Sequence, residues 1–325
     1  MPRARRTART ARTTVLTVAM LAALAVAGCS LPGAAGREPV GTPGPPDVRP
    51  LSGAASFRHA AAVRLHDLQE QVIVRCMAEH GQRYTAQPRT ASARGEETNP
   101  YGLLTARRAA TDGYGIVGEF LHVRSSPPPA DDEPRDPAWR RALLGTAAHR
   151  VSVPLPDGSH VEYSEDGCVT QARVEVYGAA WDRTEPVVAV LSARVLTAVE
   201  KDADYRAAVR RWSSCMEEAG HRAADLQAVR ERLNRRLPKA SGDPASLTAL
   251  GREEIRTAEA DARCQAATEL AEAVGKVQRS VEKRVLGSDD RKVVARHVAA
   301  KRAVLKKLGS GAAAEASNAE GQSVN

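Results

Sequence analysis

Five cysteines carry most of the reactive chemistry in this sequence, and their positions divide them into two kinds. Cys29 lies near the amino terminus, directly after a run of apolar and small residues. The other four lie in the body of the chain, at Cys76, Cys168, Cys215 and Cys264. A thiol can be acylated, joined in a disulfide or bound to a metal, and the surrounding residues favour one of these three outcomes at each position.

Cys29 ends a segment that has the three parts of an export signal. Residues 1–13 contain five arginines and no acidic residue, and residues 14–27 are uncharged and mostly apolar. Residues 26–29, VAGC, match a lipobox, whose cysteine receives a diacylglyceryl group (palmitate is a typical acyl chain) and becomes the mature amino terminus. An uncleaved membrane helix is the alternative, but the apolar stretch is shorter than the roughly 20 residues that such a helix needs. We therefore expect residues 1–28 to be a cleaved signal peptide and Cys29 to anchor the chain to the outer face of the cytoplasmic membrane.

The export signal lowers the net charge that applies to the mature chain. The whole chain has 47 basic and 39 acidic residues, which gives a formal net charge of +8. Five of the basic residues lie in the leader, so 42 basic and 39 acidic residues remain in the mature chain, a balance of about +3. This balance and the extracytoplasmic location argue against nucleic acid as a partner. Phosphate-binding loops, G-x-S-x-G and H-E-x-x-H motifs are absent as well.

The sharpest internal feature is a repeat around two of the remaining cysteines. Residues 76–81, CMAEHG, match residues 215–220, CMEEAG, as C-M-x-E-x-G, and each copy closes a predicted helix with its glycine as the cap. An even number of cysteines outside the cell favours disulfides. Of the three pairings, the repeat favours a bridge from each copy to the next cysteine along the chain, Cys76–Cys168 and Cys215–Cys264. In the chain-entropy model, bridges that close such long loops contribute on the order of 4 kcal/mol each.

The repeat allows two other interpretations. Cys76 and His80 stand at i and i+4, which suits two ligands of one metal, but the second copy does not repeat this spacing and no further cluster completes a tetrahedral set. We therefore expect no metal and no other cofactor. Glu79 and Glu218, one in each copy, would be the acid of a cell-wall hydrolase or another envelope enzyme. The sequence offers no polar partner for either glutamate, so exposed residues in a last helical turn are the favoured interpretation.

The tyrosines are where a ligand groove is expected if the chain has one. Tyr101 and Tyr114 are flanked by glycines, which let a ligand approach the backbone while the ring offers a stacking face. Further candidates are Tyr84, Trp139 and Trp181. The other interpretation is that these rings close the core beneath irregular loops, and the sequence favours it.

The elements that position these residues are expected to be mostly helices, because alanine is abundant and only 3% of residues are aromatic. Residues 29–55 are predicted to be a lipidated tether rich in proline, glycine and alanine, too sparse in large apolar residues to pack. A small β-hairpin is predicted within residues 150–163, and residues 309–325 are predicted to be disordered. The predicted helices cover residues 56–80, 101–123 with interruptions, 136–144, 168–180, 185–200, 203–219, 224–237, 246–286 and 289–308.

The predicted fold is therefore a mainly α, disulfide-stapled helical bundle over residues 56–308, in two weakly repeated halves at about 56–180 and 181–308. The last helix is basic and amphipathic, which suits an anionic membrane or teichoic acids as well as a solvated bundle edge.

The layout resembles a group of uncharacterised actinobacterial lipoproteins. The features that carry the resemblance are the lipobox, the C-M-x-E-x-G repeat, the YGL and GYG motifs at residues 101–103 and 113–115, and the DGC motif at residues 166–168. The resemblance covers roughly residues 65–270 and implies architecture, not an activity. The leading hypothesis is a non-enzymatic, lipid-anchored helical protein that acts at the cell envelope by binding a protein, a wall polymer or a small ligand. The alternative is an envelope enzyme, and the oligomeric state is open.

Overall fold

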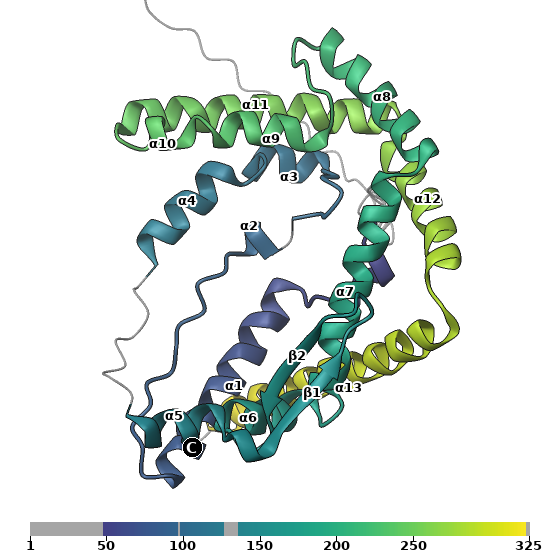
Figure 1. Ribbon diagram of the computed structural model, residues 1–325. Helices are drawn as coiled ribbons and strands as arrows, with labels where there is room; N and C mark the ends of the chain where they lie inside the picture. Colours follow the sequence, from purple (N-terminus) through teal and green to yellow (C-terminus); the bar gives the residue numbers. More distant parts are fainter. Residues whose placement is uncertain (1–47, 97, 127–135, 323–325) are drawn as a thin grey trace, which may run out of the picture. The chain divides into compact units, whose positions relative to one another are not determined.

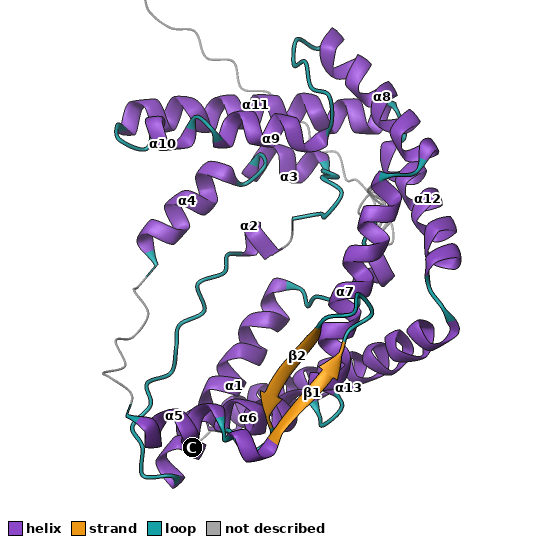
Figure 2. Cartoon of the chain, viewed as in Figure 1, coloured by secondary structure: helices purple, strands orange, loops and turns teal. Residues whose placement is uncertain are grey.

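Helices dominate the computed structural model, which describes residues 48–96, 98–126 and 136–322 (Figure 1). The two strands pair antiparallel, with Arg150 opposite Ser164 and Pro154 opposite His160, and form the only sheet among these residues (Figure 2). The predictions of a mainly helical fold and of one hairpin are thus confirmed. In chain order the elements are η1 (Pro50–Gly53), α1 (His59–Glu79), α2 (Ala93–Glu96), α3 (Ala106–Asp112), α4 (Ile116–Ser125), α5 (Pro137–Leu144), η2 (Ala147–His149), β1 (Arg150–Pro154), β2 (His160–Ser164), α6 (Cys168–Tyr177), α7 (Trp181–Glu200), α8 (Ala203–Glu218), α9 (Leu226–Asn234), α10 (Leu237–Ala240), α11 (Pro244–Ala267), α12 (Leu270–Val285) and α13 (Ser288–Gln322).

Two helical boundaries differ from the sequence prediction. The long helix expected over residues 246–286 is divided between α11 and α12 at Glu269, whose backbone is left-handed with φ +51°. No glycine or proline marks this break, so the sequence pattern did not predict it. At the other end, the helical backbone of α13 continues to Gln322, where a disordered tail is predicted. Residues 312–316 are alanine-rich, and alanine has the highest helix propensity.

The core does not follow the two predicted halves. The largest cluster of buried apolar residues lies among α7, α8, α9, α11 and α12, and it includes Tyr101 and Tyr114 from the first half. A smaller cluster joins α1, α5 and α6 around Met77 and Cys168. α13 contacts α1 through a third cluster that contains Leu65 and Val304. The segment between Tyr101 and Val117 therefore belongs with the second half in space, because α3 and α4 pack against α11.

The folded part begins earlier than predicted. Val48, Leu51 and Ala54 are buried, although they fall within the predicted tether. The backbone N–H of Leu51 donates to Glu282 Oε1 of α12 at 2.8 Å, and Gln278 Nε2 of the same helix donates to the Arg49 carbonyl at 2.9 Å. The tether boundary at residue 55 is wrong for this reason: a few apolar side chains suffice when a neighbouring helix also satisfies the backbone. The lipobox, Cys29 and the rest of the tether lie outside the described residues.

The C-M-x-E-x-G repeat is also a structural repeat. The N–H of Gln82 donates to the Met77 carbonyl at 2.8 Å, and the N–H of His221 donates to the Met216 carbonyl at 2.7 Å. These six-to-one bonds define a Schellman cap, in which the glycine adopts a left-handed conformation. Gly81 has φ +69° and Gly220 has φ +79°.

Replacing Gly81 or Gly220 with alanine is expected to lower the free energy of unfolding by about 1 kcal/mol each. An added Cβ would meet nothing within 4 Å at either position, so the cost is backbone strain and not a clash. Urea unfolding measures the change. The matched control is Gly242→Ala, at a glycine without a positive φ where an added Cβ would make only an ordinary contact, 3.9 Å from the Lys239 carbonyl oxygen, and which is expected to change stability little. Equal effects at the three positions would contradict the capping role.

Candidate functional site

Two disulfides join the copies of the repeat to later helices. Cys76 at the end of α1 is bonded to Cys168 at the start of α6, and Cys215 at the end of α8 is bonded to Cys264 near the end of α11. The pairing that the repeat favours is therefore confirmed. The first bridge closes the small α1–α5–α6 cluster, and the second fastens α8 to α11 within the large core.

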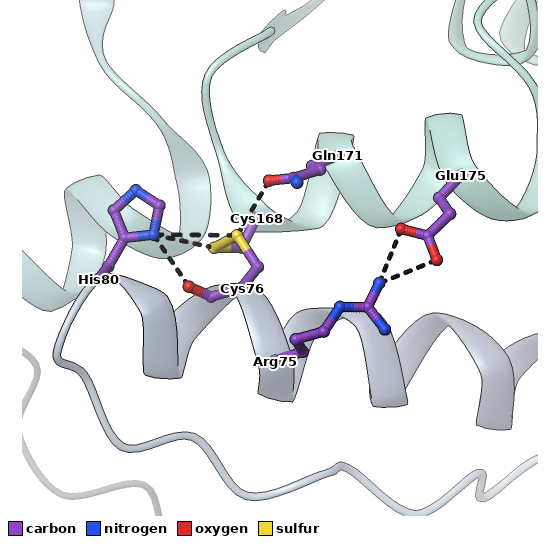
Figure 3. Close-up of a disulfide and its surroundings, with 6 residues drawn as sticks. All are labelled: Arg75, Cys76, His80, Cys168, Gln171 and Glu175. Carbon is purple, nitrogen blue, oxygen red and sulfur yellow. Dashed lines mark hydrogen bonds and ion pairs between the residues drawn. A yellow bond between two sulfur atoms is a disulfide. The ribbon is translucent and has the colours of Figure 1, made fainter.

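The surroundings of the first bridge contain a histidine (Figure 3). His80 Nδ1 lies 4.0 Å from Cys76 Sγ, 3.9 Å from Cys168 Sγ and 2.9 Å from the Cys76 carbonyl oxygen. Gln171 Oε1 of α6 lies 3.1 Å from Cys76 Sγ. Arg75, directly before the cysteine, forms an ion pair with Glu175 of α6 at 2.8 Å, so α1 and α6 are also joined on the surface.

A stripe of polar side chains on α11 is buried, which is unusual for a helix in a core. Glu254, Thr257, Asp261 and Gln265 follow one another at helical spacing, and each is less than 5% exposed. We call these four residues the α11 polar stripe. Buried polar groups need hydrogen-bond partners, and the partners of the stripe come largely from the tyrosine–glycine segment around residues 101–117.

The first contact of the stripe holds the start of α4. Glu254 accepts the N–H of Ile116 at 2.7 Å and of Val117 at 3.0 Å, so its carboxylate caps a helix distant in sequence. Burial raises the pKa of Glu254, and the backbone donors oppose this rise. A Cβ at Gly113 would lie 2.9 Å from Glu254 Cγ, so glycine is needed there for the close approach.

The second contact is a hydrogen-bond cluster around Asp261. Tyr114 Oη donates to Asp261 Oδ2 at 2.9 Å, and Trp212 Nε1 donates to Asp261 Oδ1 at 2.7 Å. Gln265 Nε2 donates to the same Oδ1 at 2.9 Å. The guanidinium of Arg230 lies 5.2 Å from the centre of the Tyr114 ring. Burial raises the pKa values of both Asp261 and Tyr114.

Tyr101 and Tyr114 therefore belong to the core, and neither lines the cleft described below. Tyr101 is 1% exposed and Tyr114 is 5% exposed, in the same cluster. Tyr84 lies elsewhere, stacked against Trp139 with ring centres 6.2 Å apart, and its hydroxyl donates to Glu70. Trp181 is buried between Tyr177 and His297. The second interpretation of the sequence, rings that close the core, is the one that the structure shows for Tyr101 and Tyr114.

A cleft of about 1020 Å³ opens beside the stripe. Its apolar lining consists of Leu103, Leu104 and several alanines. Gln265 of the stripe accepts the N–H of Leu104 at 2.9 Å, which fixes this segment. Glu269, the left-handed residue between α11 and α12, also lines the cleft. Such backbone strain is often found at functional sites. We call this site the arginine cleft because five arginines line it: Arg49, Arg58, Arg94, Arg107 and Arg108.

Local contacts position three of these arginines. Arg94 Nε pairs with Asp112 at 2.8 Å, and Arg108 donates to Thr98 Oγ1 at 3.2 Å and to the Arg94 carbonyl. Arg49 donates to the Thr98 carbonyl at 3.3 Å. Arg107 is exposed, as is Arg94. Among the described residues that line the cleft, the five arginines face three carboxylates, on Asp112, Glu269 and Glu272. An arginine fork matches carboxylate and phosphate oxygens, so the arrangement suits an anionic group.

The glutamates proposed for an enzyme are not brought into this cleft. Glu79 and Glu218 are exposed in the last turns of α1 and α8, and neither lines the arginine cleft. Sequence analysis missed the cleft itself because its arginines are scattered from residue 49 to residue 108. The adjacent pair Arg107 and Arg108 was the only local signal.

Within the described ranges, no helix combines the length and hydropathy of a membrane span. No family model, no curated protein and no solved structure matches this chain.

Proposed function

We propose that this chain is a lipid-anchored protein of the bacterial cell envelope that binds an anionic ligand, such as a phosphate- or carboxylate-bearing segment of a wall polymer, in the arginine cleft. The observation that carries the proposal is the cleft itself, about 1020 Å³ in volume and lined by five arginines. Ligand sites are concave and mostly apolar, with a few positioned polar groups. The cleft combines such a lining with positioned guanidinium groups.

The location in the envelope is inferred from the lipobox and the tether. Two bridges that close long loops suit an oxidising compartment, because disulfides persist outside the cytoplasm. The small net charge of the mature chain predicts little long-range attraction of a polyanion, so the proposed recognition is local to the cleft. The resemblance to actinobacterial lipoproteins agrees with this proposal and adds no activity to it.

A binding role is favoured over hydrolysis. A hydrolase of the kind considered needs a positioned acid with a partner across a cleft. Glu79 and Glu218 are exposed at helix ends, and neither is a lining residue of the arginine cleft. The carboxylates that do line the cleft come with an excess of arginines, which suits recognition of an anion better than proton transfer.

The test is equilibrium binding of a fluorescent glycerol-phosphate oligomer to the purified mature chain, with neutral dextran as the ligand control. The double variant Arg107→Ala, Arg108→Ala is expected to weaken binding at least tenfold, because hydrogen bonds to charged groups contribute about 1.5–3 kcal/mol each. Affinity is also expected to fall as salt rises.

The matched control is Arg252→Ala on α11, an exposed arginine that does not line the cleft. It is expected to leave affinity within twofold. Binding that responds equally to Arg252 and to the cleft arginines would mean general surface attraction. No binding at millimolar oligomer would reject the proposed ligand class.

A further inference from the structure

The Cys76–Cys168 bridge has a neighbour that the second bridge lacks. His80 stands four residues after Cys76, and its Nδ1 lies 4.0 Å and 3.9 Å from the two sulfurs (Figure 3). In the second copy of the repeat the same position is Ala219. Cys76, His80 and Cys168 are the only group of three ligand-type side chains brought within 4.8 Å of one another among the described residues.

We infer that the reduced, dithiol form of this bridge is a binding site for a soft divalent ion such as Zn²⁺, with both thiolates and His80 Nδ1 as ligands. In a tetrahedral zinc site, Zn–S bonds of about 2.3 Å and Zn–N bonds of about 2.1 Å place sulfur and nitrogen about 3.6 Å apart. The two Sγ···Nδ1 distances exceed this value by only a few tenths of an ångström. The sulfurs must separate to about 3.8 Å once their bond is broken, which rotation of the two side chains can supply.

The fourth coordination position is accessible from solvent. Cys76 and Cys168 are 2% and 0% exposed as residues, whereas His80 is an exposed residue. A small ion can therefore enter on the histidine side, and water can complete the tetrahedron. Gln171 Oε1 also lies close to the site, 3.1 Å from Cys76 Sγ. Binding requires the tautomer with its proton on Nε2, so the contact between Nδ1 and the Cys76 carbonyl is given up.

A dithiol can serve as the reductant that opens the Cys76–Cys168 bridge. Two electrons and two protons from the dithiol convert the disulfide to two thiols, and the dithiol becomes a disulfide. Zinc then displaces one proton from each thiol. A disulfide compound reverses both steps by thiol–disulfide exchange: it accepts the two electrons and two protons from solution and becomes two thiols, the protein bridge reforms, and the ion is released. The site thus binds metal only in the reduced protein, and this inference does not depend on the arginine cleft.

The experiment is a Co²⁺ titration of the full mature chain, followed by visible absorption, with and without prior reduction by a phosphine. The reduced chain is expected to bind one equivalent with a tetrahedral thiolate spectrum, and the oxidised chain none. His80→Ala in the reduced chain is expected to weaken binding at least tenfold. The reduced Cys215–Cys264 pair, kept alone in Cys76→Ser, Cys168→Ser, is the control without a histidine and is expected to bind at least tenfold more weakly than the reduced wild type.

A folding readout accompanies the titration because reduction removes a stabilising bridge. If the reduced chain loses helical circular dichroism, Zn²⁺ is expected to restore it in the wild type more strongly than in His80→Ala. Equal affinity and equal recovery in the two proteins would overturn the inference, as would the absence of binding to the reduced wild type at micromolar ion. Tight binding by the oxidised protein would overturn it too.

Discussion

Replacing Cys76 and Cys168 with alanine is expected to lower the free energy of unfolding by about 4.6 kcal/mol, and replacing Cys215 and Cys264 by about 4.1 kcal/mol. The bridges span sequence separations of 92 and 49 residues. In the chain-entropy model the stabilisation grows with the logarithm of the loop length, which gives these two values. Domains of this kind are stable by about 5–15 kcal/mol, so either loss removes a large part of the total.

Urea unfolding of the two double variants measures both losses. The first pair fastens a small cluster of buried residues around Met77, so its loss is expected to loosen α1 and α6 before the large core. Reduction of the wild type provides a control, because it is expected to cost about as much as both double variants together. A loss below about 1 kcal/mol for either pair would contradict the stabilising role.

The second large effect is expected at Asp261, the centre of the hydrogen-bond cluster beneath the arginine cleft. Asp261→Ala is expected to cost about 3–5 kcal/mol, because it leaves buried donors on Tyr114, Trp212 and Gln265 without their acceptor. Tyr114→Phe removes one of these donors and is expected to cost about 1 kcal/mol. The control on the same helix is Arg263→Ala, at an exposed side chain, expected within 0.5 kcal/mol. Similar costs for Asp261→Ala and Arg263→Ala would contradict the role of the cluster.

The raised pKa of Asp261 predicts the direction in which stability changes with pH. Burial raises the pKa of this carboxyl above the value of about 3.9 in the unfolded chain. The unfolded state therefore loses its proton first, and stability falls as pH rises from about 4 through the folded pKa. Asp261→Asn is expected to flatten the stability curve in this window. A curve of unchanged slope, measured by urea unfolding at several pH values, would show that Asp261 does not contribute the shift.

The disulfide pairing was predictable because the evidence for it is local. Four of six consecutive positions are identical in the two copies, and a glycine at the end of each copy indicates the helix cap. The structure places Gly81 and Gly220 at the predicted caps, with left-handed backbones, and joins both cysteine pairs as favoured. A helix cap is determined largely by neighbouring residues, so it can be predicted from the sequence alone.

The role of the YG and GYG motifs was not predictable to the same degree. Glycine beside an aromatic ring suits both a ligand groove and a close approach of two elements. The structure shows a close approach, because Glu254 and Asp261 on α11 bind this segment from more than a hundred residues away. A glutamate and an aspartate seven residues apart, on one face of a predicted helix, were the available signal. An acidic residue on a helix is usually solvated, so this pair alone does not predict burial.

The arginine cleft could not be predicted without the tertiary structure. Its lining joins residues from Arg49 to Glu272, and the position of Glu269 depends on a helix break without a sequence marker. The packing of the segment that contains Arg49 and Leu51 was not predictable for the same reason, since Glu282 and Gln278 satisfy its backbone from another helix. Long-range pairing of this kind leaves no periodicity in a single sequence.

The most direct test of the account is the intact mass of the protein isolated from the cell envelope, with and without reductant. The account predicts a mature chain that begins at Cys29, carries a diacylglyceryl group, and gains the mass of four hydrogen atoms when its two bridges are reduced. A full-length chain in the cytosol, with its leader uncut and Cys76, Cys168, Cys215 and Cys264 all alkylated without reductant, would contradict it.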